Sequence, residues 1–449
     1  MQIKTLNRRQ FLKTSFGAGV IASNISLLNA CSHLTNNQTN NQTQNQNQNQ
    51  KTIGRVVIIG GGYAGATAAK YIRMWSLGAI ETIVIEPNKQ FVSCPMSNLV
   101  LGGSKTINDL TFGYDLTIKN NGIKWVQDSV IAVDATAKKV RMLRGELSFD
   151  RLIIAPGVDF NYDQMPELAN LIAQEKIPHA WKAGWQTVNL RNQLVSMRDG
   201  GVFVMHVPSA PYRCPPGPYE RACQIASYFK AHKPKSKVIV LDANPEIVSK
   251  KGLFNKVFNE MYAGIIDYRP SSALVSVNVA KKIVQTEFES VIADVLNIIP
   301  PQLAGKPTQM VSTNNEKIKL NNIDNRWCEV DFLSYESTLT PNIHVIGDSV
   351  SAALPKSAHI ATNQARVCAS AIVELMSNRA PDPTPVFANT CYSFVDASLA
   401  MHVANVYRYD ETKKMMLPAE GGGVSPNPSA IEGEHASAWA TNIWSDVLT

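Results

Sequence analysis

Residues 55–86 read as strand, glycine-rich turn, helix, strand and acid, an order that few folds accommodate. The β-branched run 55–59 is typical of a buried parallel strand, and 66–74 and 81–86 are predicted to form the helix and the second strand. The turn carries the glycines of a GxGxxG motif, Gly60, Gly62 and Gly65. Such glycines let backbone N–H groups approach a pyrophosphate at a helix N-terminus, and Glu86 is placed to accept a hydrogen bond from a ribose hydroxyl. The segment predicts a dinucleotide-binding βαβ unit.

Two later segments favour FAD over NAD as this dinucleotide. Residues 150–157 read as a strand that ends in a turn of small residues at Gly157, and residues 342–348 as a strand that ends in Gly347 and Asp348. In flavoproteins with two dinucleotide-binding domains, such a Gly-Asp pair meets the ribityl and phosphate region of the flavin. The chain resembles this superfamily, the FAD-dependent pyridine nucleotide-disulfide oxidoreductases. The resemblance implies that early and late segments bind FAD together.

A second predicted βαβ unit lacks the glycine fingerprint. Its strands are expected at 201–207 and 237–241, and its helix at 222–230. Between the first strand and the helix stand several prolines and Arg213, where a nicotinamide site would need backbone that wraps a pyrophosphate. We therefore expect that a nicotinamide is not the electron donor and that the substrate reduces the flavin directly.

Two cysteines lie where redox chemistry is expected. Cys94 follows Glu86 at a short distance and should lie near the flavin. Cys214 lies in the proline-rich loop just before a helix, and both the helix N-terminus and Arg213 are expected to lower the pKa of its thiol. A structural disulfide after export is left open for the remaining cysteines, which otherwise read as buried thiols or residues near strands.

The sequence resembles the flavoprotein subunit of flavocytochrome c sulfide dehydrogenase. The resemblance extends from residue 55 to the C-terminus, and RCPPGPYERA and PHAWKAG are its most specific motifs. The matching stretches are 57–70, 94–103, 178–184, 213–222, 298–305, 344–348 and 389–393.

The resemblance implies a set of roles around the flavin. Cys94 matches the cysteine that binds the flavin covalently through a thioether to its 8-methyl carbon. Cys214 matches the first member of a redox-active cysteine pair, and Glu220 is a candidate proton acceptor beside it. The second member of that pair lies two positions past the Asp of the late motif, and this position is Val350 here.

The cysteine missing at Val350 leaves three routes open, because one cysteine cannot pass through a disulfide cycle alone. In the first, Cys214 works with another thiol such as Cys223 or Cys368. In the second, sulfide adds to the flavin directly, and in the third a different sulfur donor is used.

Two further residues are interpreted from their positions. Trp181 either borders the isoalloxazine or packs in the core, and Lys356 is expected to stabilise negative charge on the reduced flavin.

The first fifty residues have the pattern of an export signal followed by a linker. Residues 7–13 have the pattern of a twin-arginine signal, and the uncharged stretch 14–30 suits its hydrophobic region. Cys31 ends a lipobox-like motif, so the sequence predicts either a lipid anchor at Cys31 or simple cleavage nearby. The tract 36–50 is almost entirely Asn, Gln and Thr, a composition typical of a flexible tether. We expect a periplasmic protein exported by the twin-arginine route.

Charge and cysteine spacing exclude several function classes. Residues 1–50 hold four of the 43 basic residues and none of the 36 acidic ones, so the rest of the chain has only a small positive excess and predicts no nucleic-acid binding. The sequence contains no CxxC and no CxxCH, which argues against a zinc ribbon and against a c-type haem on this chain. No metal site is predicted.

These patterns predict an α/β fold with two dinucleotide-binding-type domains, similar to glutathione reductase, and a C-terminal α+β module. The expected divisions are a signal at 1–31, a linker at 32–51, an FAD domain at 52–165 with 306–380, a second βαβ domain at 166–305 and the module at 381–449. In the resembled superfamily the C-terminal module covers the flavin face or makes the oligomer interface, and in the resembled family it helps to dock a c-type cytochrome subunit.

The leading interpretation is an exported FAD-dependent oxidoreductase that takes electrons from sulfide or a related reduced sulfur species and passes them to a c-type cytochrome. Two alternatives remain: a flavin-bearing accessory protein of a sulfur-oxidising system without its own turnover, and an NADH-dependent disulfide or quinone reductase. The missing second cysteine favours the accessory protein, and the missing second GxGxxG argues against the reductase.

Overall fold

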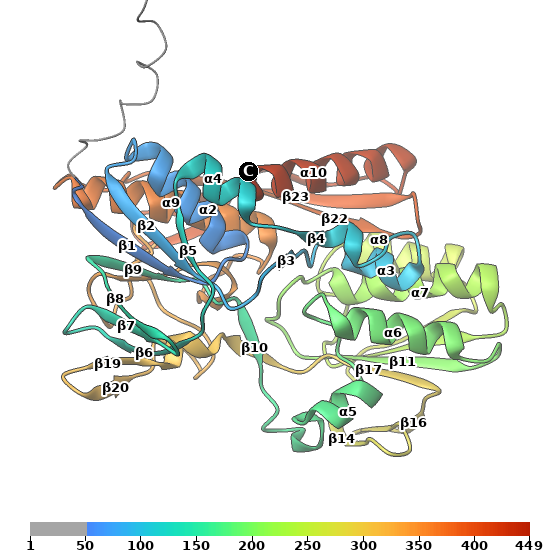
Figure 1. The fold of residues 1–449 in the computed structure, drawn as a ribbon. Coiled ribbons are helices and arrows are strands. Elements are labelled where there is room, and N and C mark those ends of the chain that lie inside the picture. Colours follow the sequence, from blue (N-terminus) through green and yellow to red (C-terminus); the bar gives the residue numbers. More distant parts are fainter. Residues whose placement is uncertain (1–51) are drawn as a thin grey trace, which may run out of the picture. The chain divides into compact units, whose positions relative to one another are not determined.

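The computed structural model describes residues 52–449, so the predicted export signal, Cys31 and the Asn/Gln-rich linker lie outside the described residues. A parallel five-stranded sheet, ordered β21-β9-β1-β2-β5, forms the centre of the first domain (Figure 1). The strands are β1 (Gly54–Ile59), β2 (Ile80–Ile85), β5 (Lys124–Val126), β9 (Arg151–Ile154) and β21 (Ile343–Val345). Helices α2 (Tyr63–Trp75) and α9 (Ala358–Met376) pack against each other beside this sheet. Early and late segments thus share one sheet.

The strand and helix limits follow from local sequence. The β-branched residues of β1 are buried on both faces, as expected for a strand between two parallel neighbours, and β1 pairs with β2 from Gly54 with Ile80 to Ile59 with Ile85. Helix α2 begins three residues before the predicted 66, because the glycine-rich turn leads straight into it without a side-chain cap.

A second sheet of the first domain also joins distant segments of the chain. Its order is β20-β19-β6-β7-β8, and it lies below the parallel sheet in Figure 1. Its strands are β6 (Val130–Asp134), β7 (Lys139–Met142), β8 (Gly145–Ser148), β19 (Val311–Thr313) and β20 (Glu316–Ile318). Strand β19 pairs with β6 in parallel, so the chain after residue 305 returns to the domain that it left.

The second domain contains a parallel sheet ordered β13-β12-β11-β17. Its elements are α5 (Leu171–Lys176), α6 (Trp185–Ser196), β11 (Val202–Val207), α7 (Gly217–His232), β12 (Lys237–Asp242), α8 (Lys251–Lys256), β13 (Ile266–Arg269), β14 (Leu274–Asn278), β15 (Ile283–Thr286), β16 (Ser290–Ile292) and β17 (Val295–Ile298). Helix α7 begins at Gly217, five residues before the predicted start, because Pro218 fits the first helical turn, where no N–H partner is needed. Strand β10 (Val158–Phe160) pairs with β18 (Gln302–Ala304) where the chain passes between the domains.

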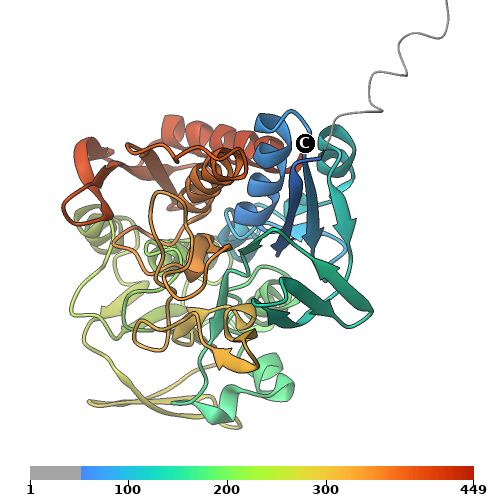
Figure 2. The ribbon, with the colours of Figure 1, turned by 90° about the vertical axis from the view of Figure 1, so that its left-hand side faces the viewer.

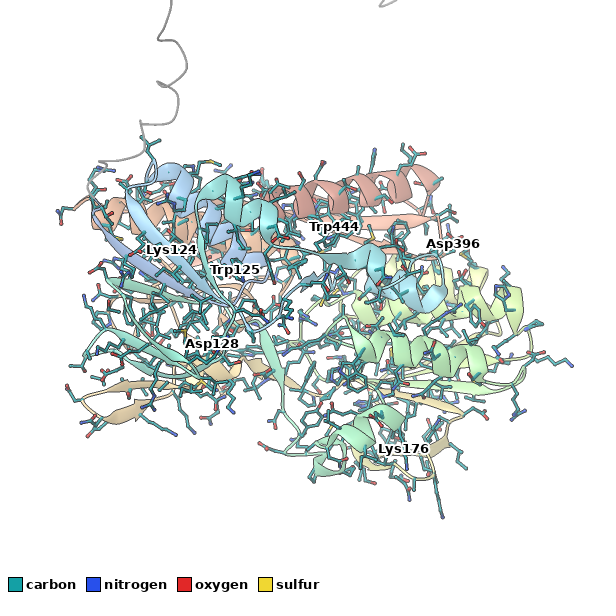
Figure 3. The ribbon with its side chains drawn as sticks, viewed as in Figure 1. Lys124, Trp125, Asp128, Lys176, Asp396 and Trp444 are labelled. Carbon is teal, nitrogen blue, oxygen red and sulfur yellow. The ribbon has the colours of Figure 1, made fainter. Side chains whose placement is uncertain are left out.

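The C-terminal module is a three-stranded antiparallel sheet followed by a helix. It consists of β22 (Val386–Phe394), β23 (Ala400–Asp410), β24 (Met415–Val424) and α10 (Ala430–Leu448). Figure 2 shows α10 beside α2, and the two helices are in contact. Trp444, labelled in Figure 3, fastens this contact because its Nε1 donates to Tyr63 Oη and Ser93 Oγ, both at 3.0 Å.

Short elements complete the fold: β3 (Phe91–Val92), α3 (Ser97–Gly102), β4 (Thr111–Phe112) and α4 (Asp115–Asn121). The predicted α/β fold class is confirmed, with parallel sheets in both domains and a C-terminal sheet-and-helix module. Within residues 52–449, no helix combines the length and hydrophobicity that a transmembrane span needs.

Candidate active site

A cavity of about 940 Å³ lies where the FAD-type turns, the second domain and the C-terminal module meet. Most of the predicted site residues line it, although they come from segments far apart in the sequence. They are Gly60, Gly62, Glu86, Cys94, Gly157, Trp181, Cys214, Glu220, Gly347 and Asp348. Gly65 and Lys356 do not line the cavity.

The glycine-rich turn has the backbone that a bound pyrophosphate requires. Gly60 has φ +102°, and a Cβ there would lie 2.4 Å from the Ala155 carbonyl oxygen. A Cβ at Gly62 would meet no atom within 4 Å, so this residue leaves the turn open to the cavity. A Cβ at Gly65 would lie 1.8 Å from the Gly60 oxygen, so Gly65 serves the close packing of α2 on the turn rather than ligand contact.

Glu86 lies buried at the end of β2 and faces the same turn. Its Oε2 accepts a 2.7 Å hydrogen bond from Gly61 N, and its Oε1 accepts from Asn88 N and Asn88 Nδ2 at 2.9 and 2.6 Å. These bonds hold the carboxylate at the edge of the cavity, where a carboxylate oxygen can accept a further bond from a ribose hydroxyl.

The late motif forms the other wall. Gly347 has φ +79°, and its N–H donates to Gln364 Oε1 at 2.6 Å. Ser349 Oγ donates to the Gly157 carbonyl at 2.7 Å, which ties the two predicted FAD turns together. Burial raises the pKa of Asp348, while the nearby Arg213 and Lys356 oppose that effect.

The prediction for Lys356 requires a correction. Its Nζ donates to the carbonyl oxygens of Asp348 and Val350, at 2.8 and 2.7 Å, and lies 3.6 Å from the centre of the Trp327 ring. The ammonium therefore stabilises the turn after β21 and does not face the flavin cavity, because two carbonyls and an aromatic face already satisfy it.

Cys214 is held in a strained, buried conformation. Its φ is +58°, a left-handed value uncommon for residues other than glycine. Its N–H donates to the Lys356 carbonyl, and its own carbonyl accepts from Gly217 N, both at 2.8 Å. These two bonds fix the loop immediately before α7, so the thiol occupies a defined place in the cavity wall.

The predicted lowering of the Cys214 pKa is wrong. Burial raises the pKa of this thiol to about 12, and the charges of Glu220 and Cys391 add to the increase. Arg213 and Lys250 act in the opposite direction but do not outweigh the loss of solvation. The helix N-terminus and the neighbouring arginine were visible in the sequence, whereas the burial was not.

Glu220 connects α7 to two other parts of the site. Its Oε1 accepts a 2.8 Å bond from Phe394 N on β22, and its Oε2 accepts a 2.9 Å bond from Asn98 Nδ2. Burial raises the pKa of this carboxyl, so its carboxylate form is a stronger base than an exposed one. Its position beside the Cys214 loop suits the proton-acceptor role that the resemblance implies.

Trp181 is both a cavity-lining and a packing residue, and its place beside the isoalloxazine stays a prediction. It lines the cavity, and it also packs, because its Nε1 donates to the Arg213 carbonyl at 3.1 Å. Arg221, which sequence reasoning did not single out, lies 4.7 Å from the Trp181 ring and donates to the carbonyls of His179 and Ala180 at 2.8 and 2.6 Å. A buried arginine thus holds the PHAWKAG loop against the cavity.

The cysteines differ in their access to the cavity. Among the described residues, Cys94, Cys214 and Cys391 line it, while Cys223, Cys328 and Cys368 are fully buried elsewhere. Val350 is buried and pairs with Cys328 in an isolated parallel bridge. The matching stretch 389–393, whose sequence is NTCYS, was the sequence signal that pointed to Cys391. Lys250, whose Nζ donates to the Cys391 carbonyl at 2.8 Å, had none.

Comparison with known proteins agrees with this geometry. Residues 54–185 match the pyridine nucleotide-disulphide oxidoreductase model, 187–300 the central model of the sulfide dehydrogenase (flavocytochrome c) flavoprotein chain, and 383–448 the flavocytochrome c sulphide dehydrogenase flavin-binding model. The protein is therefore a flavoprotein oxidoreductase that binds FAD, and the glycine turn, the acid and the cavity fit this cofactor. Within that class, the chain belongs to the family of sulfide dehydrogenase (flavocytochrome c) flavoprotein chains.

Individual relatives support both statements. The flavoprotein chain from Chlorobaculum thiosulfatiphilum is 48% identical over 46 residues, which are 10% of this chain and 94% of that relative. Mitochondrial sulfide:quinone oxidoreductase from Dictyostelium discoideum is 21% identical over 333 residues, covering 71% of this chain and 70% of that one. The solved sulfide:quinone oxidoreductase from Aquifex aeolicus has the same fold, with a TM-score of 0.69, 17% identity and coverage of 88% and 91% of the two chains.

Proposed function

We propose that this flavoprotein oxidises sulfide or a related reduced sulfur species and passes the electrons to a c-type cytochrome. The observation that carries the proposal is the shared cavity. It places Cys94, Cys214 and Glu220 against the same space as the FAD turns. When bound, FAD supplies a two-electron acceptor that can release electrons one at a time.

The chain's own residues prepare the site for an anionic sulfur substrate. Arg213 lines the cavity next to Cys214 and supplies positive charge there, which favours an anionic substrate such as HS⁻. Glu220, held by Asn98 and Phe394, is placed to take a proton from the sulfur that reacts. Arg221 holds the loop that carries Trp181 in place at the wall of the cavity.

A nicotinamide donor is disfavoured by the second domain. Asp242 ends β12, where a nicotinamide-binding unit would place its ribose-binding acid. Here Asp242 is fully buried, and its carboxylate accepts hydrogen bonds from Tyr219 Oη at 2.8 Å and Tyr268 Oη at 3.0 Å. The alternative of an NADH-dependent reductase therefore has little support in the geometry.

The test is an anaerobic titration of the purified holoprotein, followed by flavin absorbance. Sulfide should bleach the oxidised flavin, and NADH at the same concentration should not. Afterwards a soluble c-type cytochrome or a short-chain quinone is added, and the rate of flavin reoxidation identifies the acceptor. Failure of sulfide to bleach the flavin would leave the accessory protein, which the valine at position 350 favours, as the better interpretation.

Export belongs to the same proposal. The twin-arginine pattern and the resemblance support a periplasmic protein, with Cys31 either lipidated or without a role beside a simple cleavage near Ala30. Replacing Arg8 and Arg9 by lysine should leave the protein in the cytoplasmic fraction, and Cys31→Ala should release it from membranes only if the lipid is present. Recovery of the double-lysine variant in the periplasm would contradict the twin-arginine route.

A further inference from the structure

We propose that Cys391 is the second redox thiol of this site and forms a reversible disulfide with Cys214. This assignment rests on the proposed function and names the residue that replaces the thiol missing at Val350. It begins from the cavity, because Cys214 and Cys391 are the described cysteines, besides Cys94, that line it. The resemblance assigns Cys94 to the flavin thioether, so Cys391 is the thiol that remains as a partner for Cys214.

Hydrogen bonds join β22 to the Cys214 region on both sides of Cys391. After it, Phe394 N donates to Glu220 Oε1 at 2.8 Å, which joins β22 to the helix that follows the Cys214 loop. Before it, Asn389 Oδ1 accepts from Ser357 Oγ at 3.0 Å. The residue preceding that serine, Lys356, accepts the 2.8 Å bond from Cys214 N. The strand is thus held against the Cys214 loop by bonds on either side of Cys391.

Polar groups lie close to Cys391. Asn389 Nδ2 donates to Cys391 Sγ at 3.4 Å, and the buried Lys250 ammonium donates to the Cys391 carbonyl at 2.8 Å. The same ammonium lies within electrostatic range of both thiols and of Glu220. Cys214 matches the first redox thiol of the resembled family, so we assign the attack of sulfide to Cys214 and the departure to Cys391.

The other thiols fit the role poorly. Cys328 pairs with Val350 and so lies beside the position that is cysteine in the resembled family, but it is fully buried and does not line the cavity. Cys223 and Cys368 are fully buried in α7 and α9. Their burial keeps a sulfur substrate away from all three.

The cycle balances with FAD as the oxidant. HS⁻ attacks Sγ of Cys214, a sulfur–sulfur bond forms, the Cys214–Cys391 bond breaks, and the electron pair leaves on Cys391 as thiolate. A second HS⁻ attacks the outer persulfide sulfur and releases HSS⁻, which leaves one thiol and one thiolate on the protein. The thiol and the thiolate would then form the disulfide again, and the two electrons and one proton that they give up would be taken by the bound FAD as oxidant.

The test maps disulfides and follows flavin in parallel. Holoprotein is oxidised with ferricyanide, alkylated under denaturing conditions without reductant, digested and analysed by mass spectrometry. We expect a cross-linked peptide that joins Cys214 to Cys391. After anaerobic sulfide and alkylation, we expect Cys214 to carry one extra sulfur. For Cys391→Ser, the rate of flavin bleaching by sulfide should fall on the order of 100-fold, while Cys328→Ser should match the wild type.

The outcomes separate this inference from the proposed function. A cross-link from Cys214 to Cys328, a free Cys214 after oxidation, or a Cys391→Ser variant that bleaches at the wild-type rate would overturn the assignment, even if sulfide oxidation holds. If the cross-link forms but sulfide does not bleach the flavin, the thiol pair is supported and the proposed function is contradicted. Because the mapping uses the unaltered chain, it does not depend on any variant folding.

Discussion

The hydroxyl of Tyr219 donates a 2.8 Å hydrogen bond to Oδ2 of Asp242 inside the second domain. Tyr268 Oη donates to the same oxygen at 3.0 Å, and Asn244 Nδ2 donates to the other at 2.7 Å. The acid that would bind a ribose in a nicotinamide domain is therefore enclosed by the protein's own side chains. The βαβ frame of this domain positions the Cys214 loop, and the oxygens of its acid are already bonded within the protein.

Tyr219→Phe should lower the free energy of unfolding by about 1–3 kcal/mol, because it leaves a buried carboxylate oxygen with one donor fewer. Urea unfolding followed by circular dichroism measures the change. Tyr228→Phe is the matched control on the same helix, since the Tyr228 ring packs under Arg191 and should be nearly neutral in this assay. Equal losses in both variants would contradict the importance of the Asp242 bond.

Cys94→Ser should release the flavin on denaturation. If Cys94 holds FAD through a thioether, acid precipitation of the wild type leaves flavin absorbance in the pellet, whereas the variant leaves it in the supernatant. The thiol lines the cavity, so the substitution removes the bond and little of the pocket. Flavin in the supernatant of the wild type would contradict covalent attachment without affecting FAD binding as such.

Glu86→Gln should weaken FAD binding at least tenfold in a Cys94→Ser background, where binding is reversible. The loss of a charge-assisted hydrogen bond of about 1.5–3 kcal/mol corresponds to this change in Kd. Fluorescence titration with FAD measures it. Glu81→Gln is the control. Glu81 lies on β2, its carboxylate pairs with Arg55 at 2.5 Å, and it does not line the cavity. If Glu86→Gln binds FAD with the wild-type Kd, the assignment of Glu86 to the ribose hydroxyl is wrong.

Buried His206 should make the protein less stable at acidic pH. Burial lowers its pKa to about 4 from an ordinary value near 6.5, and its Nε2 lies 3.2 Å from the Ser272 carbonyl while Nδ1 has no partner. Because the unfolded chain binds the proton more readily, stability falls as the pH drops from 6.5 toward 4, by up to about 3 kcal/mol. His206→Leu should reduce this loss when unfolding is compared at pH 7 and pH 4.5, whereas the exposed His232→Leu should not.

Asp446 fastens the C-terminal helix to the FAD domain. Its carboxylate accepts from Tyr71 Oη at 3.0 Å and from Arg366 Nη2 at 2.6 Å, and its carbonyl accepts from Lys70 Nζ at 2.7 Å. Asp446→Ala should loosen α10 and destabilise the protein by about 1–3 kcal/mol. Limited proteolysis should then cut within residues 430–448 sooner than in the wild type. Unchanged cleavage would show that Trp444 and apolar packing hold the helix alone.

The first βαβ unit could be predicted almost residue by residue, because each of its signals is local. The β-branched run, the glycines and Glu86 restrict backbone and side-chain positions within one short segment, and the structure places them as expected. Element ends were less certain. Helix α7 begins at Gly217 rather than 222, since prolines that suggested a loop also fit a first helical turn.

The sequence alone determined the fold class, the FAD turns and the absence of a second glycine fingerprint, since these depend on neighbours along the chain. Tertiary structure alone decided how Cys214, Lys356 and Cys391 are used. Burial raised the Cys214 pKa against its local neighbours, the Trp327 ring and two carbonyls turned Lys356 away from the cavity, and bonds from Glu220 and Ser357 brought β22 to the Cys214 loop. Solvation and contacts between separate segments of the chain have no signature in local sequence.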